Sequence, residues 1–250
     1  MPGQERTDYT AYTLQQNELS LGVLAAEYGV VAPITVGTYL PPWFAFPWLD
    51  APVANGFVKV RDWFLEPLTI AVRGTVVYFK ANALSSKLDD AGFFAVPVDV
   101  FASLRVSSLI TQSVQLTYVH IGLAGQVPSN SVLDTGLGAA SLSSASISSL
   151  TELRLSRVVA LTLRGNLLLA QSDLIVNARA ERDATVVRAR LGAMRENHGF
   201  RGNIIPGVAL SWSHVNLYLG LGYGHIFVPV VELPTNKPSL VPDANFNVRF

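Results

Sequence analysis

The 250-residue chain has no cysteine, so it forms no disulfide bond and holds no metal through thiolates. Charged residues make up only 14% of it, whereas roughly a quarter of an ordinary soluble domain is charged. Basic and acidic residues balance to a net charge of 0, so the basic excess that marks nucleic-acid-binding proteins is missing. Half of the residues are hydrophobic, which makes the chain more apolar than a typical water-soluble domain.

The sequence also lacks a convincing transmembrane helix. Residues 28–49 carry no charge, but four prolines interrupt them, and prolines at that density do not permit a helix. Residues 202–231 are free of Asp, Glu, Lys and Arg, but they hold many glycines and alternate polar with apolar residues. The other way to cross a bilayer is a closed β-barrel, which leaves no backbone edge unpaired in lipid.

Alternation of apolar and polar residues runs through most of the chain. Residues 68–80, 95–106 and 215–228 show it most clearly, with apolar residues on one parity and polar residues on the other. A soluble antiparallel sheet with one wet face also alternates, but it normally carries Lys and Glu at high density on that face. Here most charges fall in loops or singly within strands, which favours a lipid-facing surface and a polar lumen.

The last strand carries the most motif-like feature. Phe246, Val248 and Phe250 share one face, and Phe250 is the final residue. This pattern resembles the C-terminal strand of Gram-negative outer-membrane β-barrels. The resemblance implies that these three residues form the membrane-insertion signal that the barrel-assembly machinery reads. It also implies that the protein lies in the outer membrane, in contact with its lipids.

The fold class that we predict is all-β: an antiparallel, transmembrane, up-and-down β-barrel with short periplasmic turns and longer extracellular loops. The short turns are expected near residues 30, 66, 109, 157, 183 and 214. The alternation gives 13 strands, with 18–26 as one strand and 124–149 as the longest loop, the second half of which could instead extend the following strand. A short first strand at Thr10–Leu14 raises the count to 14, which we expect; if one weak pair within 145–194 is wrong, the count is 12.

This interpretation divides the chain into a polar N-terminal segment, residues 1–16, and a single barrel, residues 17–250. No export signal is visible at Met1, because the first residues are polar. We therefore expect the numbering to begin at a mature or engineered N-terminus.

Aromatic residues are expected to form two girdles at the bilayer interfaces. Those next to short turns are Tyr28, Trp63, Phe64 and Trp212. Those at the opposite strand ends are Tyr39, Trp43, Phe44 and Phe79.

The predicted lumen face is rich in basic residues. They are Lys59, Arg61, Arg73, Arg105, Arg164, Arg188, Arg190 and Arg249. Two interpretations remain open: the charges pair across the lumen and stabilise a closed barrel, or they line a water-filled pore that favours anions.

Motifs that would indicate catalysis or a cofactor are missing. The chain has no Gly-x-Ser-x-Gly sequence, and its four histidines lack the spacing of a metal pair. We predict no catalytic residue, no metal site and no cofactor, with an outer-membrane lipase or protease as the enzymatic alternative. The expected function is a non-enzymatic membrane anchor or a subunit of a larger cell-envelope complex with protein partners. The alternative is a small porin-like channel for small, preferably anionic solutes.

Overall fold

The computed structural model describes residues 9–41, 53–62, 67–80, 89–127, 135–172, 175–182, 185–192, 201–228, 233–235 and 237–250. The strands in these stretches are β1 (Leu19–Gly22), β2 (Ala25–Val31), β3 (Ile34–Tyr39), β4 (Val53–Asp62), β5 (Leu68–Lys80), β6 (Asp89–Arg105), β7 (Ile110–Val127), β8 (Thr135–Arg154), β9 (Val159–Gln171), β10 (Ile175–Arg182), β11 (Thr185–Gly192), β12 (Gly202–Ser211), β13 (Val215–Gly224), β14 (Phe227–Val228), β15 (Leu233–Pro234) and β16 (Ser239–Arg249). No helix in the described stretches is long and apolar enough to span a membrane.

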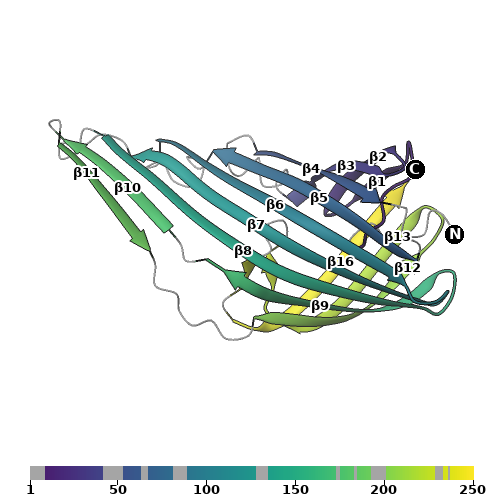
Figure 1. Ribbon diagram of the computed structural model, residues 1–250. Coiled ribbons are helices and arrows are strands. Elements are labelled where there is room, and N and C mark those ends of the chain that lie inside the picture. Colours follow the sequence, from purple (N-terminus) through teal and green to yellow (C-terminus); the bar gives the residue numbers. More distant parts are fainter. Residues whose placement is uncertain are drawn as a thin grey trace.

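Twelve of the strands close into one antiparallel barrel (Figure 1). Each strand from β1 to β9 pairs with the next, and the ring continues through β12, β13 and β16, which closes on β1. The predicted all-β, up-and-down closed barrel is confirmed. The expected count of 14 strands is wrong, and the alternative of 12 is the one observed.

The strands β10 and β11 account for the difference of two, because they lie outside the ring. The strand β8 is 20 residues long, whereas β9 has only 13. Residues 144–154 of β8 pair with β9, and residues 135–141 pair with β10. The first part of β8, which β9 is too short to cover, thus pairs with β10. The β10–β11 hairpin extends the sheet beyond the barrel (Figure 1).

The N-terminal part of the chain holds two further errors, which cancel in the strand count. Residues 18–26 are not one strand, because the chain reverses at Val23–Leu24 and β2 pairs back onto β1. Both turn residues are apolar, so the alternation continues through the turn without a sequence signal. Thr10–Leu14 is not a strand either.

The two ends of the barrel differ in their connections. One end, here called the turn end, holds the turns at 32–33, 106–109, 155–158 and 212–214 together with Phe250. The opposite end is called the loop end. The short turn predicted near 183 is misplaced, because β10 runs from Ile175, opposite Ser141, to Glu181, opposite Thr135 at the start of β8. The β10–β11 connection therefore lies at the loop end.

Side chains are sorted in the reverse of a water-soluble protein. On the outside, Val76 is 56% exposed and Leu219 is 53% exposed. On the inside, Asp99 and Ser103 are 1% and 0% exposed. A Val or Leu side chain that faces water forgoes about 1.5–3 kcal/mol relative to burial, so an outer surface of this composition requires an apolar solvent.

Exposed aromatic residues mark both borders of this apolar outer band. Tyr28 and Trp212 lie at the turn end and are 40% and 43% exposed. Tyr78, Tyr118 and Tyr223 lie toward the loop end and are 43%, 51% and 65% exposed. The two groups match the girdles of a barrel that spans a bilayer.

One residue of the predicted loop-end girdle is inside the barrel instead. The Tyr39 ring packs against Phe57, whose side chain is buried in the lumen, with 5.2 Å between ring centroids and 46° between ring planes. Strand parity decides this, because Tyr39 shares its parity with the buried Thr35. The side chains of Trp43, Phe44, Trp63, Phe64 and Phe79 lie outside the described residues.

The serine-rich segment that we expected to be the longest loop is mostly strand. The strands β7 and β8 pair without interruption from Ile110–Leu153 to Val127–Gly136. The small residues of this segment pair as strand residues. Ser144, Ser146 and Ser148 face the lumen and are at most 5% exposed.

The barrel wall has very unequal height around the ring (Figure 1). The strands β1, β2 and β3 have 4, 7 and 6 residues. The strands β6, β7 and β8 have 17, 18 and 20 residues. The turn end is nearly level, so the difference appears at the loop end.

Prolines within the strands occupy positions where the ladder needs no N–H. Pro97 faces β5 where the β5–β6 register skips from Gly74–Val98 to Val77–Ala95. Pro206 faces β13 where the β12–β13 register is interrupted. Because proline has no N–H to donate, these interruptions fit the residue type.

Candidate functional site

The N-terminal segment, residues 9–15, crosses the barrel lumen near the turn end. Thr10, Ala11 and Leu14 are 3%, 0% and 1% exposed, although none belongs to a strand. The segment is therefore an internal plug, which we did not predict from the sequence. We expected Thr10–Leu14 to form a short first strand, and no local pattern distinguishes a segment in water from one in a polar lumen.

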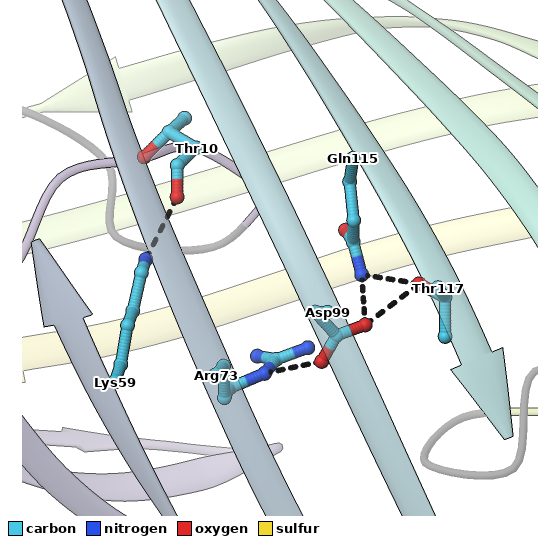
Figure 2. Close-up of polar contacts among 6 residues, drawn as sticks. All are labelled: Thr10, Lys59, Arg73, Asp99, Gln115 and Thr117. Atoms are coloured by element: carbon cyan, nitrogen blue, oxygen red, sulfur yellow. Dashed lines mark hydrogen bonds and ion pairs between the residues drawn. The ribbon is translucent and has the colours of Figure 1, made fainter.

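Three wall strands hold the backbone of this segment. The Ala11 N–H donates to Ser103 Oγ on β6 at 2.8 Å, and the Leu14 N–H donates to Thr35 Oγ1 on β3 at 2.9 Å. The Lys59 ammonium on β4 donates to the Thr10 carbonyl at 2.7 Å, as Figure 2 shows. Backbone groups that would be costly to bury alone thus have partners.

A glycine provides the space where the segment passes the wall. A Cβ atom on Gly29 of β2 would lie 1.8 Å from the Gln15 carbonyl oxygen, so only glycine fits there. Asn17 then adopts a φ of 63°, a left-handed conformation that asparagine tolerates, and the chain turns into β1.

Above the plug, Asp99 is the centre of a polar network (Figure 2). It pairs with Arg73 Nε at 2.8 Å. Its other oxygen accepts from Gln115 Nε2 at 2.8 Å and from Thr117 Oγ1 at 2.6 Å. The four residues come from β5, β6 and β7, so the network fastens three neighbouring strands on the lumen side.

Aromatic rings surround the two cations of this region. The Arg73 guanidinium lies 5.1 Å from the Phe101 ring centroid and 5.6 Å from that of Phe57. Lys59 Nζ lies 4.6 Å above the Phe101 ring. These cation–π contacts, with the Asp99 carboxylate for Arg73 and the Thr10 carbonyl for Lys59, compensate for the desolvation of the two cations.

Two more of the predicted lumen cations have acidic partners. Arg164 on β9 lies 2.9 Å from Asp243 on β16, and it stacks over the plug residue Tyr9 at 4.5 Å. Arg249 lies 3.7 Å from Glu18. The first pair links strands separated by β12 and β13 in the ring, so it crosses part of the lumen.

The remaining predicted lumen cations lie elsewhere. Arg61 donates to the Ala32 carbonyl at 3.3 Å at the turn end, and Arg105 ends β6 at the same rim, where it is exposed. Arg188 and Arg190 belong to β11, which is outside the closed ring, and their side chains lie outside the described ones. The structure therefore places Lys59, Arg73, Arg164 and Arg249 in the lumen, Arg61 and Arg105 at the turn-end rim, and Arg188 and Arg190 on a hairpin outside the ring.

The C-terminal residues lie on the outer surface. Phe246 and Phe250 are 42% and 68% exposed, and Val248 is half-buried beside Leu21 of β1. Their position at the ring closure agrees with a strand that completes the barrel, while their role as an insertion signal stays a prediction.

Within the described stretches, no group of three or more His, Cys, Asp or Glu side chains is placed to hold a metal ion. One contact has the geometry of a nucleophile and a base, because His120 Nδ1 lies 2.9 Å from Ser143 Oγ on the outer surface. Acyl transfer needs a third group that orients the histidine and donors that stabilise an oxyanion. The other described contacts of His120 and Ser143 are with Phe94, Tyr118 and Ser172, which supply neither.

A closed antiparallel barrel with an apolar outer band and a polar, occupied lumen has the architecture of a membrane β-barrel. Comparisons with protein-family models and with curated sequences find no match. Among solved structures, the translocator domain of the autotransporter NalP from Neisseria meningitidis is similar, with 10% identity, coverage of 93% of this chain and 83% of that one, and a TM-score of 0.46. The CymD monoaromatic hydrocarbon channel is similar at 8% identity, covering 94% of this chain and 88% of that one, with a TM-score of 0.41. At this level of similarity, neither structure indicates what this chain binds or transports.

Proposed function

We propose that this protein is a closed, non-enzymatic barrel in the outer membrane of a Gram-negative bacterium, where it serves as an anchor or as a subunit of a larger envelope assembly. The observation that carries the proposal is the N-terminal segment inside the lumen, tied to β3, β4 and β6 through Thr35, Lys59 and Ser103. A barrel whose lumen is crossed by its own chain is suited to hold a position in the membrane rather than to conduct solutes.

The lumen charges support the closed state. Three of the four basic residues in the lumen have a carboxylate within 4 Å, and Lys59 donates to the plug backbone. Paired charges produce little net potential for attracting anions, whereas an anion-selective pore needs an excess of positive potential. The porin-like channel therefore remains the alternative, and we expect it to require displacement of the plug.

The proposal includes a direction in the membrane. The turn end faces the periplasm and the loop end faces the outside, as short turns and long connections do in bacterial barrels. The C-terminal strand, with Phe246, Val248 and Phe250 on its outer face, is then delivered to the barrel-assembly machinery from the periplasmic side.

Planar-bilayer conductance of the refolded chain tests the closed state. We expect no steady conductance from the wild type, and a steady open pore would overturn the proposal in favour of the channel. Gly29→Val should displace the segment at Gln15 and produce conductance, because a side chain at position 29 occupies the space of the Gln15 carbonyl. Gly74→Val is the matched control, since a Cβ there meets nothing within 4 Å. If both variants stay silent, residues 9–15 are not what closes the lumen.

The anchor role is tested by cross-linking and purification of the full chain from the membranes of the cell that makes it. A stoichiometric protein partner is the expected result. Recovery of the chain alone, together with measurable conductance, would favour the channel.

Phospholipase and protease assays address the enzymatic alternative. We expect no activity that is lost on Ser143→Ala or His120→Ala. Hydrolysis that disappears in both variants but persists in Ser149→Ala, a substitution on the same strand and face, would replace the anchor proposal with a lipase.

A further inference from the structure

The outer face of β7 changes from apolar to polar toward the loop end. Leu116 is 47% exposed and belongs to the apolar outer band, whereas Tyr118 and His120, the next two residues of the same face, carry polar groups. A transmembrane β-strand needs about 9–11 residues, and a count of that length from Ile110 at the turn end reaches residues 118–120. In the membrane position proposed above, Tyr118 and His120 therefore lie where hydrocarbon gives way to lipid headgroups.

Tyr118 and His120 meet Ser143 of β8 in a short chain of hydrogen bonds. Ser143 is the direct neighbour of His120 in the β7–β8 register. The Tyr118 hydroxyl donates to Ser143 Oγ at 3.2 Å, and Ser143 Oγ lies 2.9 Å from His120 Nδ1. The Ser143 N–H donates to Ser172 Oγ, just beyond β9, at 2.9 Å. Tyr118, His120 and Ser143 thus form one group on the outer surface, here called the outer polar cluster.

The hydrogen-bond chain leaves one hydrogen unused. Ser143 Oγ accepts from Tyr118, and its bond with His120 Nδ1 has two directions, depending on which ring nitrogen is protonated. If Ser143 donates, His120 Nε2 carries a hydrogen that no described residue accepts. If His120 donates, the hydroxyl hydrogen of Ser143 has no acceptor among the described residues. In both cases the cluster offers a donor to a molecule outside the protein.

Aromatic rings border this donor. The Phe94 ring of β6 lies 5.8 Å from the His120 ring, measured between centroids, and is tilted by 47°. Phe94 occupies the space over Gly122, where a Cβ atom would collide with the ring. Phe94 and Tyr118 are 36% and 51% exposed. A molecule that binds at His120 therefore meets apolar ring surface beside the donor, which suits a ligand with an acceptor oxygen next to an apolar part.

We propose that the outer polar cluster binds the phosphate group of a membrane lipid in the leaflet at the loop end. A phosphate oxygen accepts the unused hydrogen, and a hydrogen bond to an ionised acceptor is stronger than one between neutral groups. The apolar part of the lipid lies against Phe94 and Tyr118. This inference rests on the membrane location proposed above and adds a specific lipid contact to the anchor role.

The histidines of the chain provide both the probe and its control. The full chain is refolded with 15N in its imidazole rings in a sugar-headgroup detergent, which carries no phosphate, and short-chain phosphatidylglycerol is added. We expect the His120 resonance, identified by its loss in His120→Gln, to shift until it saturates. The His214 resonance should not move. Its Nδ1 also lies close to a serine hydroxyl, 3.0 Å from Ser213 Oγ, but it belongs to the exposed turn 212–214 at the turn end.

Two further ligands separate the phosphate from the rest of the lipid. The diacylglycerol with the same acyl chains has no phosphate, and inorganic phosphate has no acyl chains. Neither should shift the His120 resonance at a concentration at which phosphatidylglycerol saturates it. An equal shift with diacylglycerol would assign the contact to the ester oxygens and overturn the phosphate site. An equal shift with inorganic phosphate would overturn a lipid as the occupant.

Substitutions test the hydrogen-bond chain itself. Ser143→Ala removes the hydroxyl that holds His120 Nδ1, and it should weaken phosphatidylglycerol binding by about tenfold or more. Tyr118→Phe keeps the ring and removes only the hydroxyl, so it should act in the same direction with a smaller effect. Ser149→Ala, on the same strand and face as Ser143, is the matched control and should bind like the wild type. Unchanged binding in both Ser143→Ala and Tyr118→Phe would overturn the role of the cluster.

Failure of this inference and failure of the proposed function give different results. If the wild type does not insert into phosphatidylcholine vesicles, the membrane proposal itself fails. If it inserts, but the His120 resonance responds to phosphatidylglycerol no more than the His214 resonance does, the membrane proposal stands and the lipid site is overturned.

Discussion

The two faces of β6 lie in different environments, a polar lumen inside and an apolar surrounding outside. On its inner face, Asp99 and Ser103 are almost fully buried, and each has hydrogen-bond partners from neighbouring strands or from the plug. On its outer face, Val98, Val100 and Leu104 are 39%, 44% and 39% exposed and have no polar function. The two faces therefore contribute to stability in different ways. Each polar side chain of the interior needs a specific hydrogen-bond or ion-pair partner, whereas the outer face needs only apolar side chains without charge.

Removing the network centre should have the largest effect. Asp99→Ala leaves the Arg73 guanidinium buried without its carboxylate, and breaking a buried ion pair in this way costs about 3–5 kcal/mol of unfolding free energy. Urea unfolding in lipid vesicles, followed by circular dichroism, measures it. Asp62→Ala, at an exposed strand end, is the control. The interior would not depend on this pair if both variants lost the same stability.

The outer face should be sensitive to charge in proportion to depth. Val100→Arg should cost about 2–4 kcal/mol, because the site faces the hydrocarbon, whereas Val106→Arg just beyond β6 should cost about 0–1 kcal/mol. The same unfolding assay compares them. A similar cost at both positions would mean that the outer face does not contact a membrane of normal thickness.

The smallest expected effect concerns the plug. Ser103→Ala removes the acceptor of the Ala11 N–H and should cost about 1–3 kcal/mol, since that donor is left buried. Amide hydrogen exchange at residues 10–14 should accelerate before the wall strands exchange. Ser113→Ala is a close control, because it removes a partner of Ser103 and leaves the bond to Ala11 in place. Equal protection of residues 10–14 in all three proteins would show that this bond does not hold the segment.

Most of the lumen site follows from parity once a strand is recognised. Lys59, Arg73, Arg164 and Arg249 were assigned to the lumen from alternation alone, and the structure places all four there. Tyr39 was assigned from its closeness to a loop and not from parity, and that assignment failed. Arg188 and Arg190 have the right alternation but lie on a hairpin that the ring does not include.

The predicted number of strands was wrong, because it depends on features that the local alternation of residues does not show. Val23–Leu24 has no turn residues, so two strands looked like one. The β10–β11 pair alternates like any other strand pair. It lies outside the ring because β9 pairs with residues 144–154 of β8, while β10 pairs with residues 135–141 beyond them. These two errors act in opposite directions on the count.

The amino-acid sequence by itself determined that the chain is a β-barrel with an apolar outside, because a period of two is a local property that any strand shows. The tertiary structure alone decided how many strands close the ring, where the wall is low, and that residues 9–15 cross the lumen. Those features depend on pairing between distant segments and on space inside the closed barrel, such as the room that Gly29 leaves for Gln15. A polar segment carries no mark that says whether its partners will be water or the inner wall.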